Sequence, residues 1–462
     1  MLFSSIPFAF YFLPAVLVLY FAVPFRFKNA VLLTFSLVFY GWGEPVYLIL
    51  MTLSILLGWV FGLLIGKCRG AGKARLFLTL SAVTSLGLLG WFKYADFAVE
   101  NLNALGLSLA LPKVALPIGI SFYTFQILSY TIDVYRGDTE SQKSLVDFGA
   151  YVSMFPQLIA GPIVRYSDVA RQLKSREHSV EKASLGVRRF VIGLSKKVLI
   201  ANQLGQLTEI YRASTQPSVL FVWMYAVAFA LQIYFDFSGY SDMAIGLGKI
   251  FGFDLLENFN YPFISRSISE FWRRWHMSLG GWFRDYVYIP LGGNRVKPLR
   301  YVGNVLAVWA LTGLWHGAAW NFVLWGLLFA ALLTAEKFLL GKWMARLPGW
   351  LVRIPVLAVL LMSFVLFNAT SMVQATSDLA RMVGLSGQPL VTAESLYYLR
   401  SYGLLLTMAV VGATPLCKNL ALRAEKSRLF AFAEPVVLCA LLLAVTAFLV
   451  GGSFNPFLYF RF

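Results

Sequence analysis

The sequence predicts an all-α integral membrane protein that crosses the bilayer many times. Hydrophobic residues occupy 59% of the 462 positions and charged residues only 13%, which is far from the balance of a soluble globular chain. Apolar stretches that approach or exceed the ~20 residues of a spanning helix recur, for example at residues 46–65, 221–237, 321–335 and 435–450. By this count we expect about eleven or twelve transmembrane helices.

The chain reads as one continuous membrane domain over residues 1–462. No Ser-, Gly- or Pro-rich linker and no soluble stretch long enough to fold separately interrupts it. The first apolar stretch, residues 8–23, has no charged segment before it and no small-residue cleavage site after it. It is therefore expected to remain as an anchor and not to be removed as a signal peptide.

The basic residues concentrate in a few segments between the apolar stretches. Lys and Arg total 39 against 22 acidic residues, a pattern typical of cytoplasmic loops that orient a membrane protein, so no nucleic-acid partner is needed to explain it. The three cysteines show no metal-ligand spacing, and neither a metal site nor a disulfide framework is expected. The loops assigned to the cytoplasm contain Lys67, Arg69, Lys73 and Arg75, then Arg165, Arg171, Lys174, Arg176, Lys182, Arg188 and Arg189, then Lys418, Arg423, Lys426 and Arg428.

His316 is the foremost candidate for a reaction centre. It is one of only three histidines and stands within the apolar run 308–325. An ionisable ring in such surroundings is costly, so it usually faces a polar cavity and has a function. The small residues Gly313 and Gly317 allow another backbone or a substrate to approach closely, and Trp315 and Trp320 are expected to wall a slot.

His276 lies in a basic and aromatic segment, residues 265–300. Aromatic rings and long basic side chains suit the membrane interface, so amphipathic helices in that plane are one interpretation. The other is a basic vestibule for a phosphate-bearing donor such as an acyl-coenzyme A, with Arg273 and Arg274 pairing phosphate oxygens. His276 is equally open to two interpretations, a backbone hydrogen bond or acceptance of a proton by a neutral imidazole.

Two acidic residues, Asp236 and Asp242, fall inside the apolar run YFDFSGYSDM at 234–243. Unpaired burial would be expensive. We expect them to pair with arginines of segment 265–300 or to bond freed backbone where a helix breaks near Gly239, and so to shape the cavity. Prolines and glycines in LPIGISFYTFQ (116–126) and FPQLIAGP (155–162) predict kinked or re-entrant helices.

Six motifs in order carry a family resemblance. LPIGISFYTFQ (116–126), FPQLIAGP (155–162), YFDFSGYSDMAI (234–245), FWRRWH (271–276), YVYIPLGG (286–293) and LWHG (314–317) follow one another as in the bacterial branch of the membrane-bound O-acyltransferase family, which the chain resembles over nearly its full length. One departure is the pair Phe367-Asn368, where relatives commonly read Phe-Arg.

The resemblance implies a fold and a reaction. Re-entrant and interfacial helices would surround a central funnel, with His316 at its floor and His276 as the second family histidine. An acetyl or related acyl group would pass from a cytoplasmic thioester, with acetyl-coenzyme A as the working donor, toward an extracytoplasmic polysaccharide such as alginate. An esterase-like extracytoplasmic partner is implied, and so is a location in the bacterial inner membrane among its lipids.

The residue chemistry offers a course for this reaction. His316 would take the hydroxyl proton as the acceptor attacks the thioester carbonyl, and Asn321 or the indole N–H of Trp315 or Trp320 would stabilise the oxyanion. An acyl-histidine relay is the other possibility. Two further classes stay open at this point: a transporter or flippase in which Asp236, Asp242 and His316 bind substrate, and a scaffold that docks an extracytoplasmic acetyltransferase.

Overall fold

The structure is a computed structural model, and it describes residues 1–159, 161–452 and 454–456. Throughout this described part the regular structure is helical and contains no strand, which confirms the predicted fold class. The Cα positions divide into two compact units. Unit 1 comprises Met1–Phe190 and Tyr240–Leu256, and unit 2 comprises Val191–Gly239 and Glu257–Phe462. The single domain expected over 1–462 stays a prediction.

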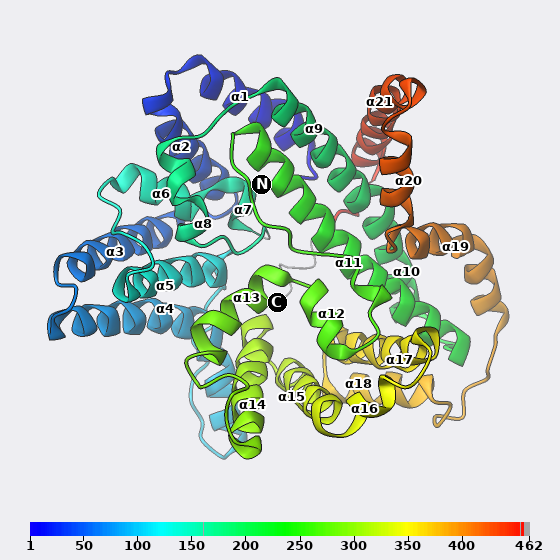
Figure 1. Ribbon diagram of the computed structural model, residues 1–462. Helices are drawn as coiled ribbons and strands as arrows, with labels where there is room; N and C mark the ends of the chain where they lie inside the picture. The colour runs from blue at the N-terminus through cyan, green and yellow to red at the C-terminus, as the bar shows by residue number, and fades with distance from the viewer. Residues whose placement is uncertain (160, 453, 457–462) are drawn as a thin grey trace. The chain divides into compact units, whose positions relative to one another are not determined.

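Unit 1 is built from helices that pack along one another. In Figure 1, α3, α4 and α5 lie side by side in blue and cyan. The elements of this unit are η1 (Phe8–Phe12), α1 (Leu13–Ala22), α2 (Phe25–Gly43), α3 (Leu48–Lys67), α4 (Gly72–Ala104), α5 (Ile120–Arg136), α6 (Leu145–Ser153), α7 (Phe155–Leu158), α8 (Tyr166–Lys174), most of α9 (Val180–Ser195) and the end of α11 (Val219–Ile250).

Unit 2 contains both family histidines. Its elements before the second histidine are the end of α9, η2 (Lys196–Ala201), α10 (Asn202–Ala213), most of α11, η3 (Pro262–Ile264), α12 (Ile268–Arg274), α13 (Met277–Phe283), η4 (Arg284–Tyr288) and α14 (Pro298–His316). The remainder are α15 (Trp320–Ala335), η5 (Glu336–Leu340), α16 (Gly341–Met344), α17 (Gly349–Asn368), α18 (Met372–Met382), α19 (Ala393–Gly412), α20 (Leu416–Ala424) and α21 (Arg428–Gly451).

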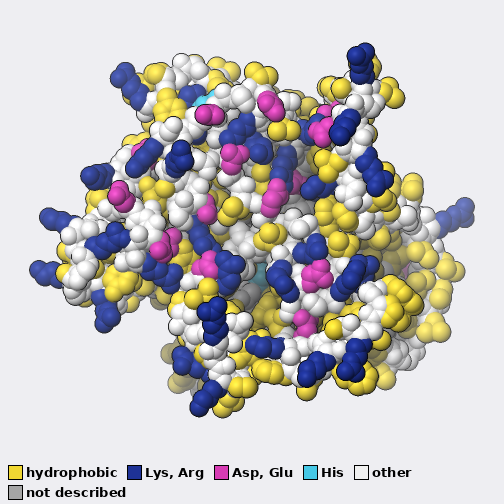
Figure 2. Space-filling view, in the orientation of Figure 1, with side chains coloured by type: hydrophobic (Ala, Val, Ile, Leu, Met, Phe, Trp, Pro, Cys, Tyr) yellow, Lys and Arg dark blue, Asp and Glu magenta, His cyan; other side chains and the backbone are white. Residues whose placement is uncertain are grey.

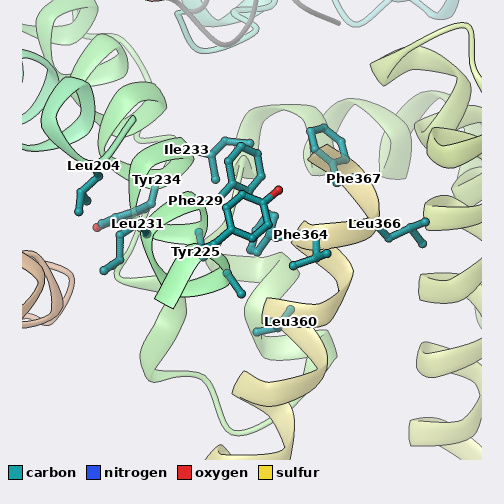
Figure 3. Close-up of a cluster of buried hydrophobic side chains, with 14 of the residues drawn as sticks. Leu204, Tyr225, Phe229, Leu231, Ile233, Tyr234, Leu360, Phe364, Leu366 and Phe367 are labelled. Carbon is teal, nitrogen blue, oxygen red and sulfur yellow. The ribbon is translucent and has the colours of Figure 1, made fainter. Parts of the chain in front are cut away.

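A large apolar core holds unit 2 together. Figure 3 shows aromatic and aliphatic side chains of α11 meeting those of α17, among them Phe229 and Phe364, whose ring centroids are 6.5 Å apart. Both side chains are almost fully buried. Because α17 is fixed against α11 in this way, the end of α17 has a defined position, and that end carries Phe367.

Fewer helices qualify as membrane spans than the sequence suggested. Within the described residues, six helical segments are long and apolar enough to cross a bilayer. The pair α19 and α20, bent by 67°, adds a seventh if it counts as one span. The expected eleven or twelve crossings also counted apolar stretches that form shorter helices, such as Phe8–Ala22. A multi-pass membrane protein is nevertheless what these helices define.

The glycines of these motifs permit close packing or begin a helix, where the sequence led us to expect kinked or broken helices. Helix α11 runs unbroken through Gly239, where a side chain would approach the carbonyl oxygen of Gly193 at 2.7 Å, so this glycine permits close helix packing. Gly119, with φ of +76°, stands before the first turn of α5, so the motif at 116–126 starts a helix. The motif at 155–162 forms the short helix α7, and its residue 160 lies outside the described residues.

Basic side chains are more frequent than acidic ones on the face of the molecule drawn in Figure 2, in keeping with the formal net charge of +17. The long basic segment between α7 and η2 is not an open loop but forms α8 and α9. Its basic residues therefore have fixed positions, and one of them, Arg189, forms an ion pair with Asp242.

Candidate functional site

A cavity of about 420 Å³ lies in unit 2, walled by α12, α13, η4 and α14. Its polar lining residues are Arg273, His276, Arg284 and Thr312. Its apolar wall includes Trp272, Trp275, Met277, Leu279, Phe283, Tyr288, Tyr301, Val305, Val308, Trp309 and Leu333. The aromatic and basic segment that the sequence singled out therefore encloses a hollow with a histidine and two arginines on its wall.

The backbone at His276 is unusual. This residue lies between α12 and α13 with φ of +45°, in the left-handed region that non-glycine residues rarely adopt. Such a conformation persists only where the surrounding structure imposes it, and it is commonest at functional sites. The side chain is buried, and its ring meets the Phe237 ring edge to face at 4.6 Å.

Hydrogen bonds to Asn258 determine which nitrogen of His276 carries the proton. The Oδ1 atom of Asn258 accepts from the backbone N–H of Ser278 at 3.2 Å and from its hydroxyl at 2.9 Å. Since this oxygen is an acceptor, the Nδ1 atom of His276, 3.2 Å away, is the donor. Burial, and then the neighbouring His316, lower the pKa of His276 well below its ordinary value. The ring is neutral, and Nε2 is left as the basic atom.

His316 is the last residue of α14 and is enclosed by aromatic rings. Its ring lies 5.0 Å from Trp315, 5.2 Å from Trp325 and 5.2 Å from Phe367, each pair at a steep interplanar angle. It does not line the cavity described above, although Thr312, one turn earlier on α14, does. Trp315 contacts both histidines, because its ring is also 5.9 Å from that of His276.

The small residues around His316 admit a neighbouring helix backbone. A methyl group at Gly313 would overlap the carbonyl oxygen of Phe322, and one at Gly326 would overlap the carbonyl oxygen of Trp309. These glycines let α14 and α15 pack in direct contact, as Figure 1 shows. The sequence left open whether another backbone or a substrate approaches these glycines, and in the structure it is the backbone of a neighbouring helix.

Asn321 and Trp320, both expected near the reacting atoms, occupy other positions. The side-chain amide of Asn321 donates to the carbonyl oxygens of Phe367 at 3.2 Å and Ala369 at 3.0 Å. It thereby holds the end of α17, and with it the Phe367 ring that contacts His316. Trp320 begins α15 with 54% of its surface exposed, and it does not line the cavity.

The two arginines of the FWRRWH motif have different surroundings. Arg273 lines the cavity and, among the described residues, donates to the carbonyl oxygen of Ser269 alone, at 3.2 Å. Arg274 is held by Glu270 in an ion pair of 2.8 Å and does not line the cavity. Arg284, which the sequence did not single out, does line it and pairs with Asp285 at 2.6 Å. Of the predicted pair, only Arg273 is placed to meet a ligand in the cavity.

The partners expected for the two buried aspartates were wrong. Asp236 pairs with Lys197 of η2 at 2.7 Å, with both side chains almost fully buried. Asp242 pairs with Arg189 of α9 at 2.8 Å. Neither pair uses an arginine of segment 265–300, because α9 and η2 are the elements that pack along α11 near these carboxylates. Neither aspartate lines the cavity.

Three residues that the sequence did not single out support the site. Asn258 orients His276. The carboxylate of Glu336 accepts from the first backbone N–H groups of α12, at 2.7 Å from Ile268 and 3.3 Å from Ser269. The indole Nε1 of Trp272 is buried on the cavity wall without a hydrogen-bond partner among the described residues. No motif in the sequence indicates these interactions, because the residues involved are distant from one another in sequence.

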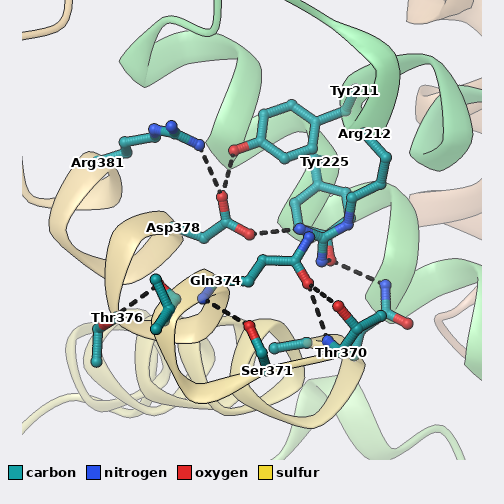
Figure 4. Close-up of polar contacts among 12 residues, drawn as sticks. Tyr211, Arg212, Tyr225, Thr370, Ser371, Gln374, Thr376, Asp378 and Arg381 are labelled. Atoms are coloured by element: carbon teal, nitrogen blue, oxygen red, sulfur yellow. Dashed lines mark hydrogen bonds and ion pairs between the residues drawn. The ribbon is translucent and has the colours of Figure 1, made fainter.

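A second polar cluster surrounds the position where the sequence departs from its relatives. Asn368 donates to the hydroxyl of Tyr225 at 2.8 Å, and Arg212 of α10 donates to the same oxygen. Figure 4 shows Arg212 reaching Asp378 as well, at 2.5 Å, with Arg381 at 3.1 Å from that carboxylate. A guanidinium is therefore present beside Asn368, supplied by another helix.

The segment that contains this site matches a known family in sequence. A profile of MBOAT, the membrane-bound O-acyltransferase family, matches residues 116–373, which include both histidines and the cavity wall. The chain belongs to this family and is an O-acyltransferase.

Three relatives illustrate the similarity. The chain is 47% identical over 345 residues to a protein of Azotobacter vinelandii named probable alginate O-acetylase AlgI, covering 73% of this chain and 69% of that one. It is 35% identical over 424 residues to a peptidoglycan O-acetyltransferase of Helicobacter pylori, covering 84% and 80%. It is 32% identical over 238 residues to a teichoic acid D-alanyltransferase of Bacillus subtilis, covering 49% and 60%.

Proposed function

We propose that this protein transfers an acetyl group from a cytoplasmic thioester, with acetyl-coenzyme A as the donor, for the O-acetylation of an extracytoplasmic polysaccharide such as alginate. The observation that carries this proposal is the pairing of two histidines through Trp315, with His276 on the wall of a cavity that also carries arginines. The names of the relatives support the polymer class, since alginate, peptidoglycan and teichoic acid are all surface polymers.

The cavity is suited to the donor. Its wall is largely apolar, as an acyl chain and a thioester arm require, and Arg273 and Arg284 supply positive charge for phosphate oxygens. Asn321, expected to stabilise the oxyanion, is not available for that role, because its amide hydrogens already bond two carbonyl groups.

The histidines move the proton. In direct transfer, His316 takes the proton of the acceptor hydroxyl while that oxygen attacks the thioester carbonyl, the C–S bond breaks, and the leaving thiolate is protonated. In this proposal His276, with its proton on Nδ1 and Nε2 as the basic atom, holds or passes that proton from the cavity wall. In the relay alternative, a histidine nitrogen carries the acyl group between the two half-reactions.

The decisive experiment uses the full-length protein in liposomes with labelled acetyl-coenzyme A. We expect His316→Ala to abolish release of free coenzyme A and transfer of label, and His276→Ala to reduce turnover by about a hundredfold, as for a general acid–base group. Matching elution profiles and melting temperatures verify that both variants fold. Full acetylation by the His316→Ala variant would remove this histidine from the mechanism.

The same assay separates this function from the other classes. A transporter would move the label across the membrane without releasing coenzyme A, and a scaffold would do neither. We further propose that the acyl group is handed to an esterase-like extracytoplasmic partner and that the protein resides in the bacterial inner membrane. Co-purification of an esterase-like protein from membranes, dependent on intact outer loops, tests the partner.

A further inference from the structure

The structure contains a group of buried cations in unit 1 that acyl transfer does not use. Lys28 near the start of α2 and Arg176 after α8 are 9% and 8% exposed. Both surround Tyr20 of α1: Lys28 Nζ donates to its carbonyl oxygen at 3.1 Å, and Arg176 Nε donates to its hydroxyl at 2.9 Å. The third histidine, His178, has its Nε2 2.9 Å from the same hydroxyl. We refer to these four residues as the Tyr20 cluster.

No carboxylate among the described residues forms an ion pair with the Tyr20 cluster. Within the described residues neither Lys28 nor Arg176 forms an ion pair, and the Nη2 atom of Arg176 is buried without a hydrogen-bond partner. Asp147 acts electrostatically on Arg176 without forming an ion pair with it, and Asp254 is already paired with Lys182 at 2.7 Å and Lys249 at 3.2 Å. Burial of unpaired positive charge is expensive, and natural sites retain it where an anion neutralises it.

The charges within the cluster repel one another. Burial, and then the charge of Arg176, lower the pKa of Lys28 from its ordinary value. Burial, followed by the charges of Lys28 and Arg176, likewise lowers the pKa of His178. An anion bound between these groups would reverse the electrostatic part of both effects.

Exposed aromatic rings border the cluster. Phe21, Phe25 and Phe27 have 48%, 39% and 47% of their surface exposed. The Lys28 ammonium lies 4.8 Å from the Phe21 ring centroid, and the Arg176 guanidinium lies 5.2 Å from that of Phe25. Exposed phenylalanines beside basic side chains are typical of the headgroup level of a membrane, where lipid phosphates lie. Since His178 is exposed too, the cluster reaches the surface.

We propose that the Tyr20 cluster binds a phosphate group, with Lys28 and Arg176 neutralising its charge. The bordering phenylalanines favour the headgroup of an anionic phospholipid as the source of that phosphate. The proposal is independent of the acyl-transfer reaction, because the cluster belongs to unit 1 and the histidine site to unit 2.

The test measures ligand binding by the full-length purified protein. In native mass spectrometry and thermal-shift assays with phosphatidylglycerol, we expect bound lipid and a raised melting temperature, and no such effect with phosphatidylcholine. Arg176→Gln and Lys28→Gln should each weaken the binding by about tenfold, as for loss of one charge-assisted hydrogen bond. Arg171→Gln is the matched control, because Arg171 is an exposed arginine of α8 outside the cluster and its removal should leave binding unchanged.

Other outcomes identify the source of the phosphate or overturn the proposal. If inorganic phosphate alone stabilises the wild-type protein but neither cluster variant, the site binds phosphate from a soluble source. If Arg176→Gln fails to fold, Lys28→Gln provides the same comparison, since within the described part of the chain Lys28 loses one hydrogen bond, to the Tyr20 carbonyl oxygen. Equal binding of phosphatidylglycerol by the wild type, Lys28→Gln and Arg171→Gln, with no response to phosphate, would overturn the proposal.

Discussion

At the scale of single residues, the candidate site contains groups that fix a histidine as well as the histidine itself. Asn258 accepts from both the ring of His276 and the N–H of Ser278, so one amide oxygen sets the ring orientation and the position of its proton. Partners of this kind commonly matter nearly as much as the residue they orient.

Replacement of Asn258 tests this role. Asn258→Ala removes the acceptor, so His276 is free to protonate Nε2 instead, and we expect kcat to fall by about tenfold to a hundredfold with KM for the donor little changed. Asn258→Asp retains an acceptor oxygen and should recover part of the rate. Steady-state kinetics with labelled acetyl-coenzyme A measures both, and full activity of Asn258→Ala would show that the hydrogen bond is dispensable.

Arg273 offers a second test at this scale. Because its side chain lines the cavity and forms no ion pair among the described residues, Arg273→Gln should raise KM for acetyl-coenzyme A by about tenfold, the value of one charge-assisted contact. Arg295→Gln is the control, since Arg295 is exposed in the same segment and does not line the cavity. Equal KM values in the two variants would separate Arg273 from donor binding.

At the scale of helices, the α14–α15 contact positions His316. Gly313 and Gly326 allow the two backbones to meet, and Asn321 fastens the start of α15 to the end of α17. The three helices therefore form one support for the rings around His316. A side chain in this contact must push backbone against backbone, which a packed interior tolerates poorly.

Glycine replacement measures the contact. Gly326→Ala should lower stability by about 1–3 kcal/mol and the melting temperature accordingly, because the added methyl group overlaps the Trp309 carbonyl oxygen. Gly303→Ala is the matched control on α14, since no atom lies within 4 Å of its added methyl group. Thermal denaturation in one detergent compares them, and equal melting temperatures would contradict the close contact.

At the scale of the molecule, polar clusters inside an apolar protein fix how distant segments meet. Asp378 of α18 joins Tyr211 and Arg212 of α10, at 2.8 Å and 2.5 Å, and so links parts of unit 2 far apart in sequence. Asp378→Asn removes the charge that two arginines share, and we expect a loss of about 2–3 kcal/mol, moderated because both arginines are partly exposed. The exposed Asp138→Asn is the control, and unchanged thermal stability of Asp378→Asn would contradict this role.

The sequence predicted the class of the molecule well and its local contacts poorly. The helical membrane fold and the family are confirmed, because hydrophobic composition and ordered motifs are properties of the chain itself. By length and composition six helical segments, or seven, qualify as spans among the described residues, where eleven or twelve were expected. The partners expected for Asp236 and Asp242 were wrong, since an apolar run does not reveal which helix packs beside it. The roles of His316 and His276 stay predictions.

The sequence by itself determined that this protein is a multi-pass helical O-acyltransferase with two histidines in apolar or interfacial surroundings. Only the tertiary structure decided that His276 lines a cavity and bonds Asn258, that His316 stands behind aromatic rings, and that Lys28 and Arg176 meet around Tyr20. The physical reason is that bilayer burial follows from the composition of each segment, whereas polar partners inside the protein are set by helix packing between residues distant in sequence.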